Sequence, residues 1–204
     1  MTQIIVPGKN IEAVLFDHGN VLSGNSGPDT REVTDKLNDA YGLDLKIEAV
    51  QAALKETLPR FQEGEIEERE FWEIFSRAVR PVIVKPIDRL LWVELGIEHD
   101  RLSEFDNEAV KLVMRLQTNG YRVGVLSNTI RPLAAINRAK GRYDYFDKGL
   151  VFLSCELGMT KNKSEIFDVV CERGKLDPEK TLFIDDVLRY VEVARTKKLN
   201  GVHF

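Results

Sequence analysis

The sequence has only two cysteines, Cys155 and Cys171, among its 204 residues. This low cysteine content argues against a disulfide framework and favours a reducing compartment. Long hydrophobic runs are also missing, and none approaches the roughly 20 residues that a membrane-spanning helix needs. The first ten residues lack the basic and hydrophobic regions of a secretory signal peptide. We therefore expect a cytoplasmic protein with no membrane partner.

An excess of charge of one sign is likewise absent. The 29 Lys and Arg residues are nearly balanced by 33 Asp and Glu residues, and the net charge is −4. The sequence contains no long run of Lys and Arg residues, so it does not indicate a nucleic-acid partner. A hydrophobic fraction of 43% is ordinary for a globular protein and excludes a disordered or fibrous chain. The length suggests one large domain or one domain with a modest insertion, and the oligomeric state stays open.

Short hydrophobic runs predict strands that are buried on both faces of a sheet. These runs cover residues 14–16, 123–126, 150–153, 182–184 and 201–204. Helical patterns that alternate with the later runs cover residues 105–118, 133–139, 163–172 and 188–197. Strands alternating with helices predict an α/β fold with a Rossmann-like, doubly wound parallel sheet.

Residues 23–103 break this alternation, because they contain no convincing strand. A capping box formed by Asp29 and Glu32 opens a run of expected helices. These helices are expected at 30–40, 47–57, 66–79 and 87–95, with breaks at Gly42, Pro59, Pro81 and Pro86. The acidic stretch from Glu63 to Glu70 is interpreted as a solvated helix start. The prediction is a helical cap, 23–103, inserted into a core made of 1–22 and 104–204.

Polar residues follow the hydrophobic runs at the points where the predicted strands end. They are Asp17, Ser127 with Asn128, Ser154, and Asp185 with Asp186. The carboxyl ends of parallel strands meet at one edge of a sheet, where ligands bind. Three carboxylates repel one another unless a cation lies among them, and oxygen ligands favour Mg²⁺. Lys161 follows the third run and could reach the same edge, where helix N-termini also favour a phosphoryl group.

Four segments, in this order, resemble the motifs of the haloacid dehalogenase-like hydrolase superfamily. They are residues 16–22, 125–129, 157–161 (followed by Ile166 and Phe167) and 183–186. The first two are most similar to the branch of sugar-phosphate phosphatases and epoxide-hydrolase phosphatase domains. The resemblance implies a Rossmann-like core with a helical cap, and hydrolysis of a small phosphomonoester with the help of Mg²⁺.

The resemblance also implies the roles of individual residues. Asp17 would be the nucleophile and form an aspartyl-phosphate, and Lys161 would offset the negative charge of the nucleophile and the phosphoryl group. Mg²⁺ would be held by Asp17, the backbone carbonyl of Gly19 and an Asp185 or Asp186 carboxylate. Phosphate binding would fall to Ser127, Asn128, Lys161, Gly19 and Asn20. The cap would close over a small phosphorylated metabolite and select its leaving group.

The sequence departs from the usual phosphatase motifs at several positions. Gly19 stands where these phosphatases usually carry an Asp as general acid and base, although some sugar-phosphate phosphatases also have Gly there. His18 is adjacent, but its side chain should alternate away from that of Asp17. Arg189 and Tyr190 occupy positions where the family often has an acidic or amide residue that supports the metal. Lys163 lies close enough to Lys161 to compete for its role.

Two other functions remain open at this stage. One is hydrolysis of a carbon–halogen bond by Asp17, which needs neither a metal nor the missing general acid. The other is a family member that keeps the fold but binds a partner or metabolite without catalysis, which the Arg189–Tyr190 departure favours. The sequence does not identify the substrate.

Overall fold

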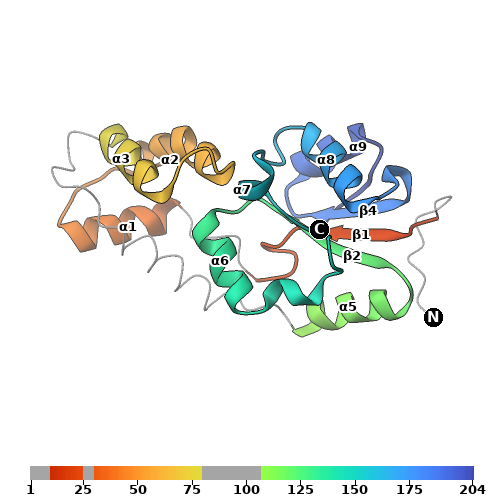
Figure 1. Ribbon diagram of the computed structural model, residues 1–204. Helices are drawn as coiled ribbons and strands as arrows, with labels where there is room; N and C mark the ends of the chain where they lie inside the picture. The colour runs from red at the N-terminus through yellow and green to blue at the C-terminus, as the bar shows by residue number, and fades with distance from the viewer. Residues whose placement is uncertain (1–9, 25–29, 80–106) are drawn as a thin grey trace.

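The computed structural model describes residues 10–24, 30–79 and 107–204 (Figure 1). Within these residues, five parallel strands form one sheet in the order β3-β2-β1-β4-β5. The strands are β1 (Ala13–Phe16), β2 (Arg122–Ser127), β3 (Val151–Leu153), β4 (Thr181–Asp185) and β5 (Asn200–His203). Each predicted run matches a strand to within one residue at either end. The predicted doubly wound α/β fold is therefore confirmed.

Helices cover both faces of this sheet (Figure 1). One face carries α5 (Asn107–Thr118) and α6 (Arg131–Ala139), and the other carries α8 (Glu165–Gly174) and α9 (Leu188–Thr196). Successive side chains of β1 alternate between the two faces: Val14 and Phe16 pack with α5, whereas Ala13 and Leu15 pack with α8 and α9. Because both faces are covered, the strands read as continuous hydrophobic runs in the sequence.

Short helices complete the connections of this core. They are the 3-10 helix η1 (Arg142–Tyr145), the one-turn helix α7 (Ser154–Leu157) and the 3-10 helix η2 (Pro178–Lys180). Helix α7 begins directly where β3 ends, so it lies at the carboxyl edge of the sheet. That edge is where the predicted site residues should gather.

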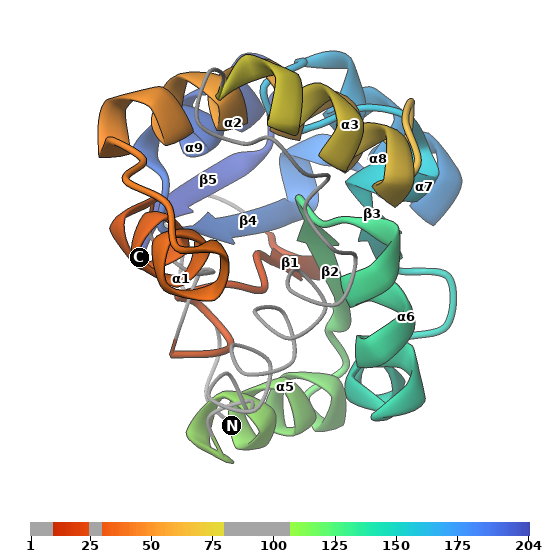
Figure 2. The same cartoon turned by 90° about the vertical axis from the view of Figure 1, so that its left-hand side faces the viewer.

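The helices α1 (Thr30–Tyr41), α2 (Ile47–Gln62) and α3 (Glu68–Ala78) lie beyond this edge (Figure 1). Figure 2 views the molecule from their side, with α2 and α3 above the strands in this view and α1 to their left. They share a hydrophobic cluster that includes Leu37, Phe61 and Phe71 and is joined by Ile130 at the start of α6. The helices thus have a core of their own, and one side of it rests on the sheet domain.

Two predictions in this helical region are wrong. Helix α2 does not stop before Pro59 but continues to Gln62, because burial of Phe61 stabilises the turn that follows the proline. Glu63 is not part of a solvated surface: its exposed fraction is 8%, whereas Glu65 and Glu67 are exposed.

Other expectations for this region are not tested. The helix expected at 87–95, the breaks at Pro81 and Pro86, the cap residue Asp29 and the boundary at 103/104 all lie outside the described residues. Among the helices in the described ranges, none is both long and hydrophobic enough to cross a membrane.

Candidate active site

The register of the sheet places two carboxylates side by side. Phe16 lies opposite Ile184, and the main-chain N–H of Asp17 donates to the Ile184 carbonyl at 2.8 Å. Asp17 and Asp185, the next residues along, therefore leave neighbouring strands at the same level. Ser127 ends β2 on the other side of β1 and is buried. Three of the predicted site residues thus lie at one edge of the sheet.

Lys161 completes this group from the loop between α7 and α8. Its ammonium nitrogen Nζ lies 2.6 Å from Asp17 Oδ1 and 2.5 Å from Asp185 Oδ2, and only 1% of the residue is exposed. Lys163, the competing lysine, pairs with Glu63 instead, at 2.7 Å. The structure therefore brings Lys161, and not Lys163, to the two carboxylates.

The charges at this edge are strongly coupled. Burial alone would lower the pKa of Lys161, but the carboxylates of Asp17 and Asp185 outweigh it and raise the pKa above its usual value. Burial raises the pKa of Asp185, the charge of Asp17 raises it further, and Lys161 opposes both effects. Lys161 therefore keeps its proton although it is buried, and places a positive charge beside Asp17 and Asp185.

A third carboxylate extends the cluster towards solvent. Oxygens of Asp17, Asp185 and Asp186 lie within 4.8 Å of one another. Asp185 is fully buried, and its second oxygen accepts from the main-chain N–H of Val187 at 2.8 Å. Asp186 is partly exposed, and one of its oxygens accepts from the Asn20 side-chain amide at 2.7 Å.

This donor set fits a divalent cation. Among Asp17, Asp185, Asp186 and Lys161, one positive charge faces three negative charges, so a second cation would relieve the remaining repulsion. The donors are all oxygens, which are the ligands that Mg²⁺ prefers in proteins. The cluster could therefore hold a metal ion of this class.

Asn128 and Tyr190 border the lysine. The Asn128 amide oxygen accepts from the main-chain N–H of Lys161 at 3.0 Å, and its amide nitrogen donates to the Tyr190 hydroxyl at 3.3 Å. The Tyr190 ring centre lies 5.0 Å from Lys161 Nζ, within the range of a cation–π contact. Tyr190, which stood out in the sequence only as a departure, thus helps to enclose Lys161, and Asn128 holds the lysine backbone.

The loop after β1 carries the remaining residues of the first motif. Gly19 pairs with Ser23 in an isolated bridge, and Asn20 adopts a left-handed φ of 54°. The His18 ring lies beside that of Tyr143, with the ring centres 6.3 Å apart. Arg189, the other departure, is exposed on α9.

Sequence reasoning missed Glu63, which approaches this edge from the helical region. Its carboxylate accepts a hydrogen bond from the Thr160 hydroxyl at 3.2 Å, in addition to the ion pair with Lys163. Five acidic residues lie between positions 63 and 70, and nothing in the local sequence separates Glu63 from the exposed ones. One member of such an acidic stretch gives no signal that it will be buried.

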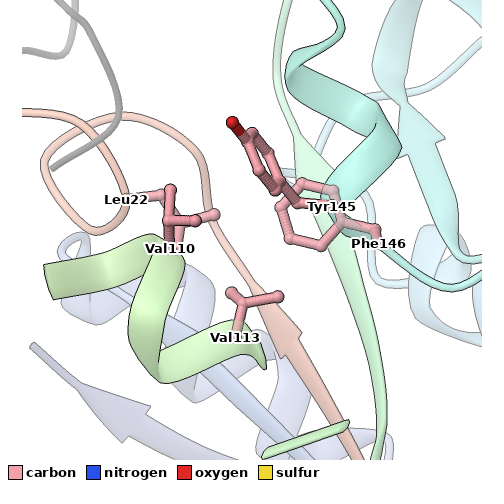
Figure 3. Close-up of a pocket in the computed structure, with 5 residues that line it drawn as sticks. All are labelled: Leu22, Val110, Val113, Tyr145 and Phe146. Atoms are coloured by element: carbon pink, nitrogen blue, oxygen red, sulfur yellow. The ribbon is translucent and has the colours of Figure 1, made fainter. Parts of the chain in front are cut away.

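A small hydrophobic pocket lies apart from these polar groups, between α5 and the segment that follows η1 (Figure 3). It is lined by Leu22, Val110, Val113, Tyr145 and Phe146. None of these side chains carries a charge, so the pocket lacks the charged groups that the cluster around Asp17 provides.

Comparisons with known proteins identify the family of this chain. The model of the haloacid dehalogenase-like hydrolase family matches residues 11–195. The chain therefore belongs to the haloacid dehalogenase-like (HAD) hydrolases. A comparison with curated proteins returned no match.

Several solved structures share the fold of this chain. The HAD family enzyme BT-2542 from Bacteroides thetaiotaomicron, in complex with magnesium and inorganic phosphate, is 22% identical, with 95% of this chain and 94% of that chain covered and a TM-score of 0.70. A predicted HAD-like hydrolase from Porphyromonas gingivalis is 24% identical, with coverages of 95% and 90% and a TM-score of 0.70. The L-2-haloacid dehalogenase from Xanthobacter autotrophicus is 21% identical, with coverages of 95% and 77% and a TM-score of 0.60.

Proposed function

We propose that this hydrolase is a Mg²⁺-dependent phosphatase that cleaves a small phosphomonoester through an aspartyl-phosphate on Asp17. The observation that carries the proposal is the cluster at the carboxyl edge of the sheet. Asp17 lies 2.6 Å from the buried ammonium of Lys161, and its carboxylate is within 4.8 Å of those of Asp185 and Asp186. Such a cluster combines an ionised nucleophile with groups that bind cations and anions.

The reaction would proceed in two displacements. An Asp17 oxygen attacks phosphorus, the bond between phosphorus and the ester oxygen breaks, and the leaving oxygen takes a proton from solvent. Water then attacks the aspartyl-phosphate, releasing inorganic phosphate and restoring the carboxylate. Lys161 offsets the negative charge that gathers when an anionic carboxylate approaches an anionic phosphoryl group.

The candidate ligands of Mg²⁺ differ in whether their oxygens already accept hydrogen bonds from the protein. Asp17, Asp186 and the Gly19 carbonyl are the ligands that we favour, because both Asp185 oxygens already accept hydrogen bonds, from Lys161 and Val187. Asp185 would then anchor Lys161. When bound, the ion would neutralise charge between the nucleophile and the phosphoryl group.

Phosphate binding would use the end of β2 and Lys161. Ser127 is buried at this edge and would contact the phosphoryl group. The Asn128 amide is already bonded to the main chain of Lys161 and the Asn20 amide to Asp186, so these two residues would position Lys161 and Asp186. A small phosphorylated metabolite, such as a sugar phosphate, is the proposed substrate. The magnesium and inorganic phosphate held by BT-2542, a protein of the same fold, support this choice. The free, buried thiols of Cys155 and Cys171 support a cytoplasmic location.

Position 19 has no acidic side chain that could protonate the leaving group, and this affects which substrates would react fast. Gly19 has no side chain, and the His18 ring lies beside Tyr143. Side-chain acid–base help contributes about 10²–10⁴-fold in rate, so we expect turnover to depend steeply on the acidity of the leaving group. Aryl phosphates with graded leaving-group pKa values would measure this dependence directly.

Carbon–halogen hydrolysis is the second candidate, because the fold is shared with an L-2-haloacid dehalogenase and Asp17 could attack carbon as well as phosphorus. That reaction has no use for a group of three carboxylates, which is why we favour phosphoryl transfer. A binding protein without catalytic activity is the third, and it would explain the replacement of a metal-supporting residue by Tyr190.

One experiment separates these functions. A panel of phosphomonoesters and a 2-haloacid is incubated with wild type and Asp17→Asn, with and without Mg²⁺. The matched control is Asp168→Asn, which changes an exposed carboxylate that pairs with Lys197. The proposal predicts Mg²⁺-dependent phosphate release that is lost in Asp17→Asn and kept in Asp168→Asn. Halide release without metal supports the second candidate. If neither phosphate nor halide is released and the protein is folded, the third candidate, a binding protein without catalytic activity, is supported.

A further inference from the structure

Glu63 is a buried carboxylate at the boundary between the helical region and the sheet domain. It follows α2 directly, and its exposed fraction is 8%. Burying a charge is unfavourable unless it is paired and hydrogen-bonded. The position of Glu63 therefore depends on the groups that receive it from the other side of the boundary.

Those groups flank the lysine of the proposed active site. The Thr160 hydroxyl donates to Glu63 Oε1 at 3.2 Å, and Lys163 Nζ lies 2.7 Å from Glu63 Oε2. The hydrogen bond from Lys163 to Glu63 raises the pKa of Lys163. One carboxylate from the helical region thus holds the residue before Lys161 and the second residue after it.

The chain around Glu63 is itself fixed to the sheet domain. The Ser154 hydroxyl donates to the Gln62 carbonyl at 2.7 Å, and Arg131 donates to the Gly64 carbonyl at 3.2 Å. Gly64 has a φ of +67°, and a Cβ atom there would lie 2.4 Å from the Cys155 carbonyl oxygen. Contacts before and after Glu63 therefore give its carboxylate a fixed location.

We propose that Glu63 is a positioning residue that holds the Lys161 loop so that the ammonium stays between Asp17 and Asp185. The inference rests on the proposed function of Lys161. Asn128 secures the main chain of Lys161 from the sheet, and Glu63 secures its neighbours from the helical region. The helices beyond the sheet thus contribute to the chemistry through the placement of the lysine as well as by covering the site.

The test measures the placement of Lys161 without relying on activity. Wild type, Glu63→Gln and Thr160→Val are briefly treated with acetic anhydride, and acetylation of Lys161 is quantified by mass spectrometry relative to the exposed Lys148. Asp168→Asn, which removes a solvent-accessible ion pair with Lys197 on the sheet domain, is the matched control. Lys161 is almost fully buried in wild type, so its labelling reports on the loop.

The proposal predicts that Lys161 acetylation rises about tenfold in Glu63→Gln and less in Thr160→Val, with no change in Asp168→Asn. Because small displacements of a catalytic group cost up to about 10²-fold in rate, kcat should fall about tenfold in Glu63→Gln while KM changes little. Unchanged Lys161 acetylation in both variants, with only a lower melting temperature, would overturn the proposal and leave Glu63 a structural contact.

The two failures can be told apart. If wild type shows no phosphatase activity with any substrate, the proposed function fails, yet the acetylation of Lys161 still decides whether Glu63 holds it in place. If wild type is active and acetylation rises without any change in kcat, the positioning role is wrong and the phosphatase stands.

Discussion

The carboxyl edge of the sheet and the helical region beyond it contribute to the same site in different ways. At the sheet edge, strand register brings Asp17 and Asp185 side by side, and Lys161 joins them from the loop between α7 and α8. Among the described residues of the helical region, residues 62–64 reach the core beside Lys161 through a carboxylate and two main-chain carbonyls.

The groups that would react and the groups that would position Lys161 therefore lie in different parts of the molecule. Asp17 and Asp185 are held by the sheet, where a shift of register would disrupt the strand pairing. The groups that would hold the lysine loop lie at the boundary between the sheet domain and the helical region. The following predictions test whether the two regions differ in this way.

The largest expected effect distinguishes the two lysines. Lys161→Met leaves two buried carboxylates without their shared ammonium, so we expect a loss of about 3–5 kcal/mol in the free energy of unfolding. Lys163→Met removes one partner of the buried Glu63, which keeps the hydrogen bond from Thr160, so the loss should be smaller, about 1–2 kcal/mol. Urea unfolding at pH 7 with a chelator measures both. Equal losses in the free energy of unfolding would contradict the claim that the sheet edge and the helical boundary differ.

The pH dependence of the Lys161→Met deficit has a definite sign. Without the ammonium, the already raised pKa of Asp185 should rise further, and a carboxyl with a raised folded-state pKa stabilises the fold below its unfolded pKa and loses that contribution as pH rises. The deficit of Lys161→Met relative to wild type should therefore shrink as pH falls from 7 towards 5. A deficit that grows on acidification would contradict this electrostatic origin.

A smaller effect is expected at Gly64. Gly64→Ala and Gly42→Ala both place a side chain at a left-handed φ, of +67° and +62°, which costs about 1–2 kcal/mol. A Cβ at Gly42 would meet nothing within 4 Å, whereas at Gly64 it would collide with the Cys155 carbonyl. Gly64→Ala should therefore be less stable than Gly42→Ala by about a further 1–2 kcal/mol in urea unfolding. Equal losses would show that residues 62–64 are not packed tightly on the core.

The smallest effect compares the two thiols. Burial raises the pKa of both Cys155 and Cys171 to about 11, so both should react slowly with a disulfide reagent at pH 8, and their rates should keep rising with pH beyond 9. In Gly64→Ala, Cys155 lies under the displaced segment and should react several-fold faster. Cys171, buried among α8 and its neighbours, should react as in wild type. Parallel acceleration of both thiols would indicate global loosening instead.

The fold was largely predictable from the sequence, because its signal is local. The strands β1 to β4 are largely buried and therefore appear as continuous hydrophobic runs, and the polar residue that follows each run marks the ligand edge; the edge strand β5 is partly exposed. That reasoning led to Asp17, Ser127 and Asp185, and the structure brings them to one edge together with Lys161. Pro59 was misread, because tertiary burial of Phe61 outweighs the local cost of a proline in a helix.

The missed parts of the site depend on tertiary contacts. Glu63 resembles its exposed acidic neighbours in the sequence, and only the packing of α2 against α7 buries it beside Thr160. Tyr190 appeared as a departure from a motif, and its contacts with Lys161 and Asn128 follow from the orientation of α9. Contacts of this kind leave no periodicity or spacing that a single sequence could reveal.

The central claim is that Asp17 carries the phosphoryl group, and acid quenching tests it most directly. Wild type and Asp17→Asn are mixed with Mg²⁺ and an aryl phosphate, quenched in acid within one turnover, digested and mapped by mass spectrometry. The account predicts a phosphoryl adduct on the peptide that contains Asp17, formed only with Mg²⁺ and absent from Asp17→Asn. An adduct on another residue, or phosphate release by Asp17→Asn at the wild-type rate, would contradict it.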